Sequence, residues 1–204
     1  MAQGLSSWHQ AGNLPPRVVD FLWNAIDLHF PGGLNLSVET GCGLSTLMLD
    51  HKSQHHICFT IGENDNSLQS VKASGIFKGE NTQFVLGPSQ KTLHDLPDII
   101  RDKTGDAGNK IDFALIDGAH AYPFVEMDYW HIYPYLNSWS LLAVDDIHIP
   151  TITRFYEFLR EEDMFDFYGV IQNTALFVRN ATEIFDPYGD GWERQGFNKR
   201  HFKP

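Results

Sequence analysis

Short apolar runs and longer stretches with helical spacing alternate along the chain. Each of five apolar runs is followed by a segment whose apolar residues recur every three or four positions. Such alternation predicts βαβ units, and therefore a mostly parallel sheet with helices on both faces. The strands are expected at Leu34–Glu39, Ile57–Ile61, Gln83–Leu86, Ile111–Ile116 and Leu141–Val144. The helices are expected at Leu44–Leu49, Leu68–Ala73, Thr92–Arg101, Tyr122–Tyr135 and after Thr151 through Leu159.

The pattern changes after the fifth unit. Two strand-like runs, Phe165–Ile171 and Ala175–Val178, are separated by only three residues. Three residues are too few for a helical crossover, so the two runs should form an antiparallel hairpin. The expected fold is therefore an α/β, doubly wound, mostly parallel seven-stranded sheet whose last strand is antiparallel.

The flanking segments complete one expected domain over residues 1–204. Residues 1–33 are expected to hold a loose arm and a lead-in helix, which begins at Pro15-Pro16 and ends before Pro31-Gly32-Gly33. Residues 34–179 form the core, and residues 180–204 form a tail rich in aromatic and basic residues. No pattern in the tail indicates what it contacts.

Composition narrows the classes of function. The 204 residues include 42% hydrophobic residues, which suits a globular domain with a sizeable core. The net charge of −11 argues against a nucleic-acid partner and suits a cationic ligand. Two cysteines, Cys42 and Cys58, do not make a disulfide framework. The sequence has neither a signal-peptide pattern nor an apolar run long enough for a membrane span, so a cytoplasmic protein without a membrane partner is expected.

The first strand ends in a glycine turn that suits a nucleotide-like ligand. Glu39 closes the strand, Gly41 and Gly43 flank Cys42, and a helix follows. Glycines in such a turn allow a positive φ and a close approach of ligand to backbone. The dinucleotide fingerprint requires a third glycine where this chain has Thr46, which disfavours a nicotinamide-dependent oxidoreductase without excluding it.

The motif Glu-Thr-Gly-Cys-Gly-x-Ser-Thr resembles the first motif of the class I S-adenosylmethionine-dependent methyltransferases. The order of strands and helices over residues 34–179 is also similar to theirs. The resemblance implies S-adenosylmethionine as cofactor, with an acid after the second strand on the ribose and a serine after the third strand near the adenine. In this chain Glu63 stands one position late, and Pro88 replaces the usual acid before the serine. The implied cofactor contacts are Glu39, Thr40, Gly41, Cys42, Gly43, Ser45, Thr46, Glu63, Ser89 and Asp117.

Acids follow the fourth and fifth strands, which are neighbours in this fold. Asp117, Asp145 and Asp146 can converge there, and a divalent cation such as Mg²⁺ would relieve their repulsion. His120 is then placed to take a proton from a substrate hydroxyl. The Asp-x-x-His and the later acid pair resemble the metal-dependent sugar O-methyltransferases of the macrocin type, which implies metal ligands and a base at these positions.

The sequence therefore predicts an O-methyltransferase for a small hydroxylated molecule, with Asp117 and His120 as catalytic residues and Asp117, Asp145 and Asp146 as metal ligands. Asp117 can instead cap a turn, so a metal-independent methyltransferase stays open, as does a non-catalytic cofactor-binding protein. His148 is read as a surface residue, a supporting partner or an alternative base, and Tyr122 as the aromatic residue best placed to reach substrate. Whether the protein forms a homo-oligomer is left open.

Overall fold

The computed structural model describes residues 14–106 and 108–203, and it contains the seven-stranded sheet that the sequence predicts. The strand order is β3-β2-β1-β4-β5-β7-β6. Strands β1 to β5 are parallel to one another, and β7 is inserted antiparallel between β5 and β6. The doubly wound fold class and its antiparallel last strand are thus confirmed, whereas residues 1–13 of the expected arm lie outside the described residues.

The elements follow the predicted order with some changed ends. The strands are β1 Leu34–Thr40, β2 Ser53–Thr60, β3 Thr82–Leu86, β4 Ile111–Ile116, β5 Leu136–Val144, β6 Phe165–Ile171 and β7 Thr174–Arg179. The α-helices are α1 Pro16–His29, α2 Leu44–Lys52, α3 Asn66–Lys72, α4 Ser89–Thr92, α5 Leu96–Thr104, α6 Phe124–Ile132, α7 Pro150–Glu161 and α8 Gly196–His201. Short 3₁₀ turns occur at η2 Leu93–Asp95, η3 Tyr133–Tyr135 and η4 Trp192–Arg194.

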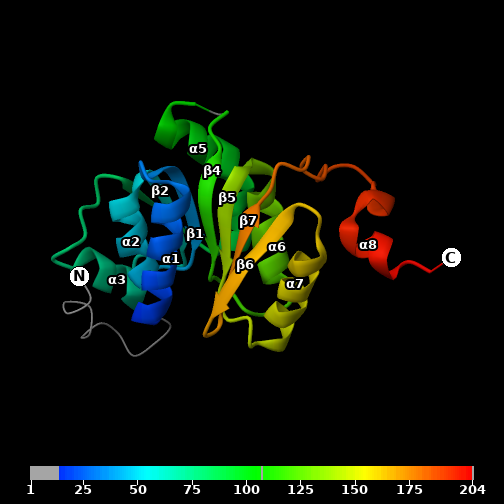
Figure 1. Cartoon of the computed structure of the whole chain (residues 1–204). Helices are drawn as coiled ribbons and strands as arrows, with labels where there is room; N and C mark the ends of the chain where they lie inside the picture. The colour runs from blue at the N-terminus through cyan, green and yellow to red at the C-terminus, as the bar shows by residue number, and fades with distance from the viewer. Residues whose placement is uncertain (1–13, 107, 204) are drawn as a thin grey trace.

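The helices cover the two faces of the sheet in separate groups. Helices α1, α2 and α3 lie on one face, and α6 and α7 lie on the other (Figure 1). Each group buries its apolar residues against the inward side chains of the central strands. Strands β1 and β4 are buried along almost their whole length, as expected for parallel strands that are covered on both faces. No helix in the described ranges is long and apolar enough to cross a bilayer.

Strand β5 begins at Leu136 instead of Leu141, and the helix expected over Thr92–Arg101 is divided into α4, η2 and α5. Two further boundaries differ for local reasons. The aromatic helix expected over Tyr122–Tyr135 begins only at Phe124, because Pro123 occupies its N-cap position, and its last turn is 3₁₀. Strand β2 begins at Ser53, four residues before the expected start, and it includes His56 in the buried part of the sheet. The hydrophobic pattern misses the first four residues of this strand because all four are polar.

Strand β1 lies at the point where the strand order reverses. The N–H of Gly41 donates to the carbonyl of Phe59 on β2 (3.0 Å), while the N–H of Asp117 donates to the carbonyl of Thr40 (3.1 Å). The chain after β1 is therefore held between the ends of β2 and β4. In open α/β sheets, this reversal point is where ligands bind.

Candidate active site

A cleft of about 430 Å³ opens at the carboxyl ends of β1, β2, β3 and β4. Its volume lies within the range of small-molecule sites. Six predicted site residues line it: Gly41, Cys42, Ser89, Asp117, His120 and Asp146. The sequence analysis assigned no site role to its other lining residues, which are Phe59, Thr60, Ile61, Asp65, Ser67, Gly87, Pro88, Gln90, Gly118 and Ala119.

Gly41 is the residue on which the glycine turn depends. Its φ of +92° lies in the region that L side chains rarely adopt, and a Cβ added there would meet the carbonyl oxygen of Asp117 at 2.2 Å. The turn therefore presses directly on the loop after β4. The helix behind it is capped internally, because Thr46 Oγ1 accepts the N–H of Gly43 (2.9 Å).

The remaining residues of the motif form the wall behind the cleft. Glu39, Thr40, Gly43, Ser45 and Thr46 were expected to contact the cofactor, but none of them lines the cleft. The side chains of the four non-glycine residues are almost completely buried. Two of them bond to neighbouring loops: the Thr46 hydroxyl donates to Cys42 Sγ (3.7 Å), and the Thr40 hydroxyl accepts the N–H of Asp117 (3.3 Å). Thr46 thus contacts the glycine turn, and Thr40 contacts the loop after β4.

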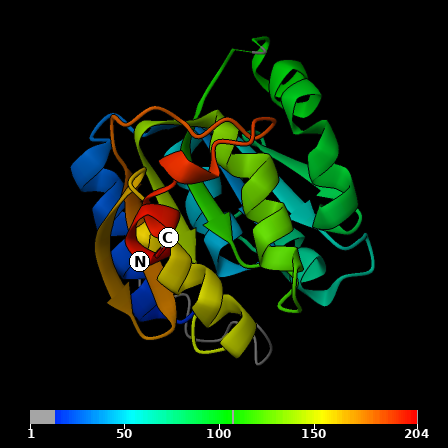
Figure 2. The ribbon, with the colours of Figure 1, turned by 90° about the vertical axis from the view of Figure 1, so that its right-hand side faces the viewer.

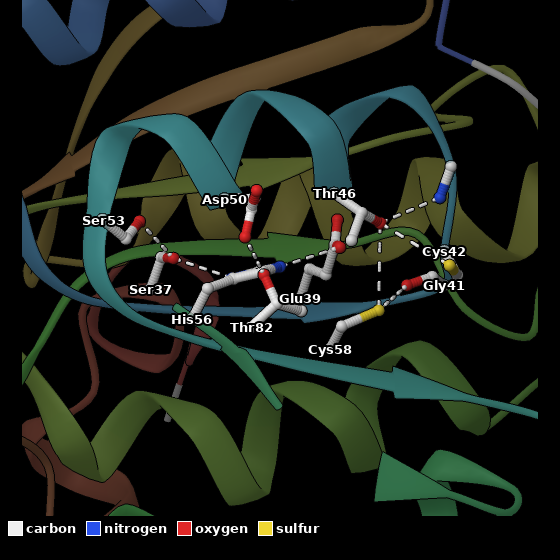
Figure 3. A network of polar contacts seen from close by, with 11 residues as sticks. Ser37, Glu39, Gly41, Cys42, Thr46, Asp50, Ser53, His56, Cys58 and Thr82 are labelled. Carbon is white, nitrogen blue, oxygen red and sulfur yellow. Dashed lines mark hydrogen bonds and ion pairs between the residues drawn. The ribbon is translucent and has the colours of Figure 1, made fainter. Parts of the chain in front are cut away.

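Glu39 belongs to a buried polar network between β1, β2 and α2 (Figure 3). Its Oε1 lies 3.1 Å from Nε2 of His56, and Nδ1 of His56 lies 2.8 Å from Oγ of Ser37. The thiol of Cys58 donates to the carbonyl of Gly41 (3.2 Å), which connects the network to the glycine turn. Burial raises the pKa of this thiol well above its ordinary value, so Cys58 stays protonated.

The acid that enters the cleft after β2 is Asp65 rather than Glu63. Strand β2 ends at Thr60, and the exposed turn that follows points Glu63 away from the cleft lining. Asp65 caps α3 through Oδ1, which accepts the N–H of Ser67 (2.8 Å), while Oδ2 accepts the hydroxyl of Thr60 (3.1 Å). An Asp followed two residues later by a serine at a helix start is a capping signal that could have identified it.

Ser89 lines the cleft but already has a partner. Its hydroxyl donates to Oδ2 of Asp128 on α6 (3.0 Å), and its oxygen accepts from Gln90 Nε2 (3.0 Å). Asp128 is fully buried, and desolvation raises the pKa of its carboxyl to about 6. A Cβ on Gly118 would meet the same carboxylate at 2.9 Å, so Asp128 packs closely against a backbone segment that lines the cleft.

The chemistry-bearing side chains converge after β4 and β5. Asp117, His120 and Asp146 place one potential ligand atom each within 4.8 Å of one another. Nε2 of His120 lies 3.0 Å from Oδ2 of Asp146, and Nδ1 of His148 lies 3.6 Å from its Oδ1. Burial, together with repulsion from Asp145 and Asp146, raises the pKa of the Asp117 carboxyl well above its usual range. Such crowding of acids is typical of a cation site.

Asp145 faces away from this cluster. Its Oδ1 accepts the hydroxyl of Thr174 at the start of β7, and burial raises the pKa of its carboxyl. The adjacent Asp146 has a φ of +55°, which turns its carboxylate toward His120 instead. The structure therefore brings together two of the three expected metal ligands and the expected base, but not Asp145.

A smaller cavity adjoins the cleft at Asp146. It has a volume of about 280 Å³ and lies against α1 and the β6–β7 turn. Asp146 lines both cavities, whereas Asp117 and His120 line only the cleft. Its lining is mostly polar: Pro15, Val18, Asp145, Asp146, Gln172, Asn173 and Thr174. Tyr122, which was expected to reach substrate, lines neither cavity and is 73% exposed.

Several solved structures with a similar fold are O-methyltransferases. The chain is similar to an O-methyltransferase from Bacillus cereus in complex with S-adenosylhomocysteine, with 14% identity, a TM-score of 0.61 and 84% of each chain covered. It is also similar to TomG from Streptomyces achromogenes, an O-methyltransferase of tomaymycin synthesis in complex with S-adenosylmethionine, with 12% identity and a TM-score of 0.64 over 83% of this chain and 82% of that one.

A third neighbour contains a metal ion. MycE, a methyltransferase of the mycinamycin pathway in complex with Mg²⁺ and S-adenosylhomocysteine, has 12% identity and a TM-score of 0.50 over 76% of this chain and 48% of that one. No curated protein sequence matches the chain.

A family model described as a methyltransferase domain matches residues 38–147. This range begins in β1 and ends just after Asp146, so it contains the glycine turn and all three residues of the cluster. The chain belongs to this methyltransferase family, and its fold is that of the class I S-adenosylmethionine-dependent enzymes.

Proposed function

We propose that the protein transfers the methyl group of S-adenosylmethionine to a hydroxyl of a small polar molecule. The observation that carries the proposal is the cluster of Asp117, His120 and Asp146 where the cofactor cleft meets the smaller cavity. A methyl donor in the cleft and a hydroxyl compound in the smaller cavity would meet there. Two of the named neighbours that hold this cofactor or its product are O-methyltransferases, which supports oxygen as the acceptor atom.

The cleft offers suitable contacts to the two ends of the cofactor. We propose that the backbone around Gly41 and Cys42 holds the amino-acid end, and that Asp65 takes the ribose role expected of Glu63. A carboxylate has room for several hydrogen bonds, so Asp65 can accept both ribose hydroxyls while still capping α3. The adenine would then lie against the exposed apolar side chain of Ile61 and the turn at Gly87 to Gln90.

Asp117 and Asp146 fit a divalent cation such as Mg²⁺. This ion is held by one or two carboxylates together with water and substrate oxygens, so two acids suffice without Asp145. The bound ion would lower the pKa of the substrate hydroxyl. The Mg²⁺ in MycE supports a cation in this fold.

The residues of the chain then have distinct tasks. Asp146 orients His120 through the 3.0 Å contact, and His120 accepts the hydroxyl proton. The substrate oxygen forms a bond to the methyl carbon as the carbon–sulfur bond breaks, which leaves S-adenosylhomocysteine and a methyl ether. Positioning of the two reactants supplies much of the rate enhancement.

Isothermal titration calorimetry with S-adenosylmethionine and S-adenosylhomocysteine tests the cofactor. We expect both to bind, and Glu39→Gln, in the buried wall, should disturb binding mainly by destabilising the fold. Absence of binding by either compound in the intact protein would overturn the proposal.

Activity toward a panel of polyols, sugars and catechols, measured with and without chelator, tests the acceptor and the cation. We expect Asp117→Ala to lose Mg²⁺-dependent activity, while Asp98→Ala, an exposed acid on α5, serves as the control. Full activity in chelator would instead favour a metal-independent reaction in which the His120–Asp146 pair alone removes the proton.

A further inference from the structure

A third cavity lies between α6, α7 and the C-terminal tail, and we call it the tail cavity. It has a volume of about 410 Å³ and shares no lining residue with the cleft or with the cavity beside Asp146. Aromatic side chains dominate its walls: Tyr129, Trp130, Tyr133, Phe155, Phe158 and Phe185. A concave site of this size with aromatic walls is typical of small-molecule binding.

The tail is held over this cavity by specific contacts. Tyr133 Oη donates to the carbonyl of Phe185 (3.0 Å), and the N–H of Phe197 donates to Glu162 Oε1 (2.9 Å). The N–H of Phe185 also contacts Met164 Sδ (3.2 Å). Figure 2 shows the tail passing in front of the side of the molecule that carries α6 and α7. The tail is thus a wall of the cavity.

Two residues that line the cavity each carry a polar atom that lacks a partner among the described residues. Tyr129 Oη and Glu126 Oε2 are both buried, and both residues line the cavity. Burial raises the pKa of Tyr129 well above its usual value, so its phenol stays a hydrogen-bond donor. Glu126 offers an acceptor. Because an unpaired buried polar group is costly, a ligand that supplies an acceptor and a donor gains from both.

The charged residues of the lining favour a ligand of positive charge. Glu126 and Glu162 contribute two acids, against one basic residue, Arg154. Aromatic faces also attract cations, and aromatic side chains make up much of the lining. The net charge of −11 acts in the same direction. The lining therefore favours an ammonium group over a carboxylate.

We propose that the tail cavity binds a small aromatic amine, independently of the methyl-transfer site. The ring lies among the aromatic walls, the ammonium group donates to Glu126, and an oxygen on the ring accepts from Tyr129.

Calorimetry on the whole protein without cofactor tests this, with tyramine as probe and 4-hydroxyphenylacetate as the anion of the same shape. We expect tyramine to bind at least tenfold more tightly than the anion. Glu126→Gln should weaken tyramine binding about tenfold and Tyr129→Phe about threefold to tenfold. Glu157→Gln, which removes an exposed acid of α7 outside the cavity, should leave the affinity within twofold.

Three results would overturn the proposal. One is no tyramine binding at millimolar concentration, and another is equal binding of the amine and the anion. The third is affinity that survives Glu126→Gln but is lost in Asp146→Asn, which would place the amine beside the cluster. If Glu126→Gln does not fold, the comparison of the two probes on the unaltered protein still decides. Because no cofactor is added, failure here is distinct from failure of the methyltransferase proposal.

Discussion

Two carboxylate–histidine pairs of nearly equal length join neighbouring strands or the loops that follow them: Glu39 and His56 lie within β1 and β2, and Asp146 and His120 follow β5 and β4. Glu39 and His56 approach to 3.1 Å with both side chains fully buried. Asp146 and His120 approach to 3.0 Å with their side chains 28% and 43% exposed. The first pair has access only to protein atoms, whereas the second faces two cavities. The same chemical pair therefore serves structure in one place and is available for chemistry in the other.

The difference shows that residue type alone does not locate an active site. Glu39 opens the motif that resembles a cofactor-binding motif, yet its side chain is buried and its hydrogen bond is to His56 on β2. Asp146 has no sequence motif of comparable specificity, yet it lies where the two ligands would meet. Removing one member of each pair should separate these roles, because a buried carboxylate that loses its partner is costly while an exposed one is solvated by water.

The largest effect is expected from His56→Ala. This change leaves the buried Glu39 carboxyl without its imidazole partner, so the free energy of unfolding should fall by about 3–5 kcal/mol. Urea denaturation measures it. His120→Ala is the matched control and should change stability by less than about 1 kcal/mol. Equal losses in the two variants would show that the pairs do not differ as described.

Asp128 is a buried carboxyl that has no imidazole partner, so it can be compared with the buried Glu39–His56 pair. The pKa of Asp128 is about 6 in the folded protein against 3.8 ordinarily, so its ionisation on going from about pH 4 to pH 6 costs stability. Asp128→Asn removes that cost and can still accept from Ser89. We expect it to stabilise the protein by about 3 kcal/mol at pH 8, with the gain disappearing near pH 4. Denaturation curves at several pH values measure this, and a gain independent of pH would contradict it.

Gly41→Ala tests the contact that joins the buried and the open regions. The new methyl group would collide with the Asp117 carbonyl at a φ that alanine disfavours. We expect the affinity for S-adenosylmethionine to fall about tenfold to a hundredfold, since such strain costs about 1–3 kcal/mol. Gly62→Ala, where nothing lies within 4 Å of an added Cβ, should bind normally. Calorimetry on the two variants compares them.

The smallest effect concerns the acid after β2. Asp65→Asn keeps the helix cap but weakens the acceptor offered to a ribose, so the affinity for S-adenosylmethionine should fall about fivefold to tenfold. Glu63→Gln removes a charge two residues earlier, outside the cleft, and should have no measurable effect. Loss of affinity in the Glu63 variant alone would show that Glu63, as expected from the sequence, contacts the ribose and Asp65 does not.

The succession of strands and helices and the glycine turn could be predicted because they follow from apolar runs, crossover lengths and turn residues. Which acid enters the cleft could not, since it depends on backbone torsions that no local pattern reports. Asp145 and Asp146 are adjacent and identical in type, and only the positive φ of Asp146 separates their directions. Asp128 was missed because nothing in the sequence shows that a single acid within an apolar helix is buried and bonds a serine of the cleft.

The close approach between Gly41 and Asp117 has a thermodynamic consequence. The turn proposed to hold the cofactor and the acid proposed to hold the cation press on one another with no atom between them. Ligands at two such sites share one free energy of coupling. Whatever factor the cation applies to the dissociation constant of the cofactor, the cofactor must apply to that of the cation. Titrating the cofactor with and without the cation, and the cation with and without the cofactor, would therefore give the same coupling free energy.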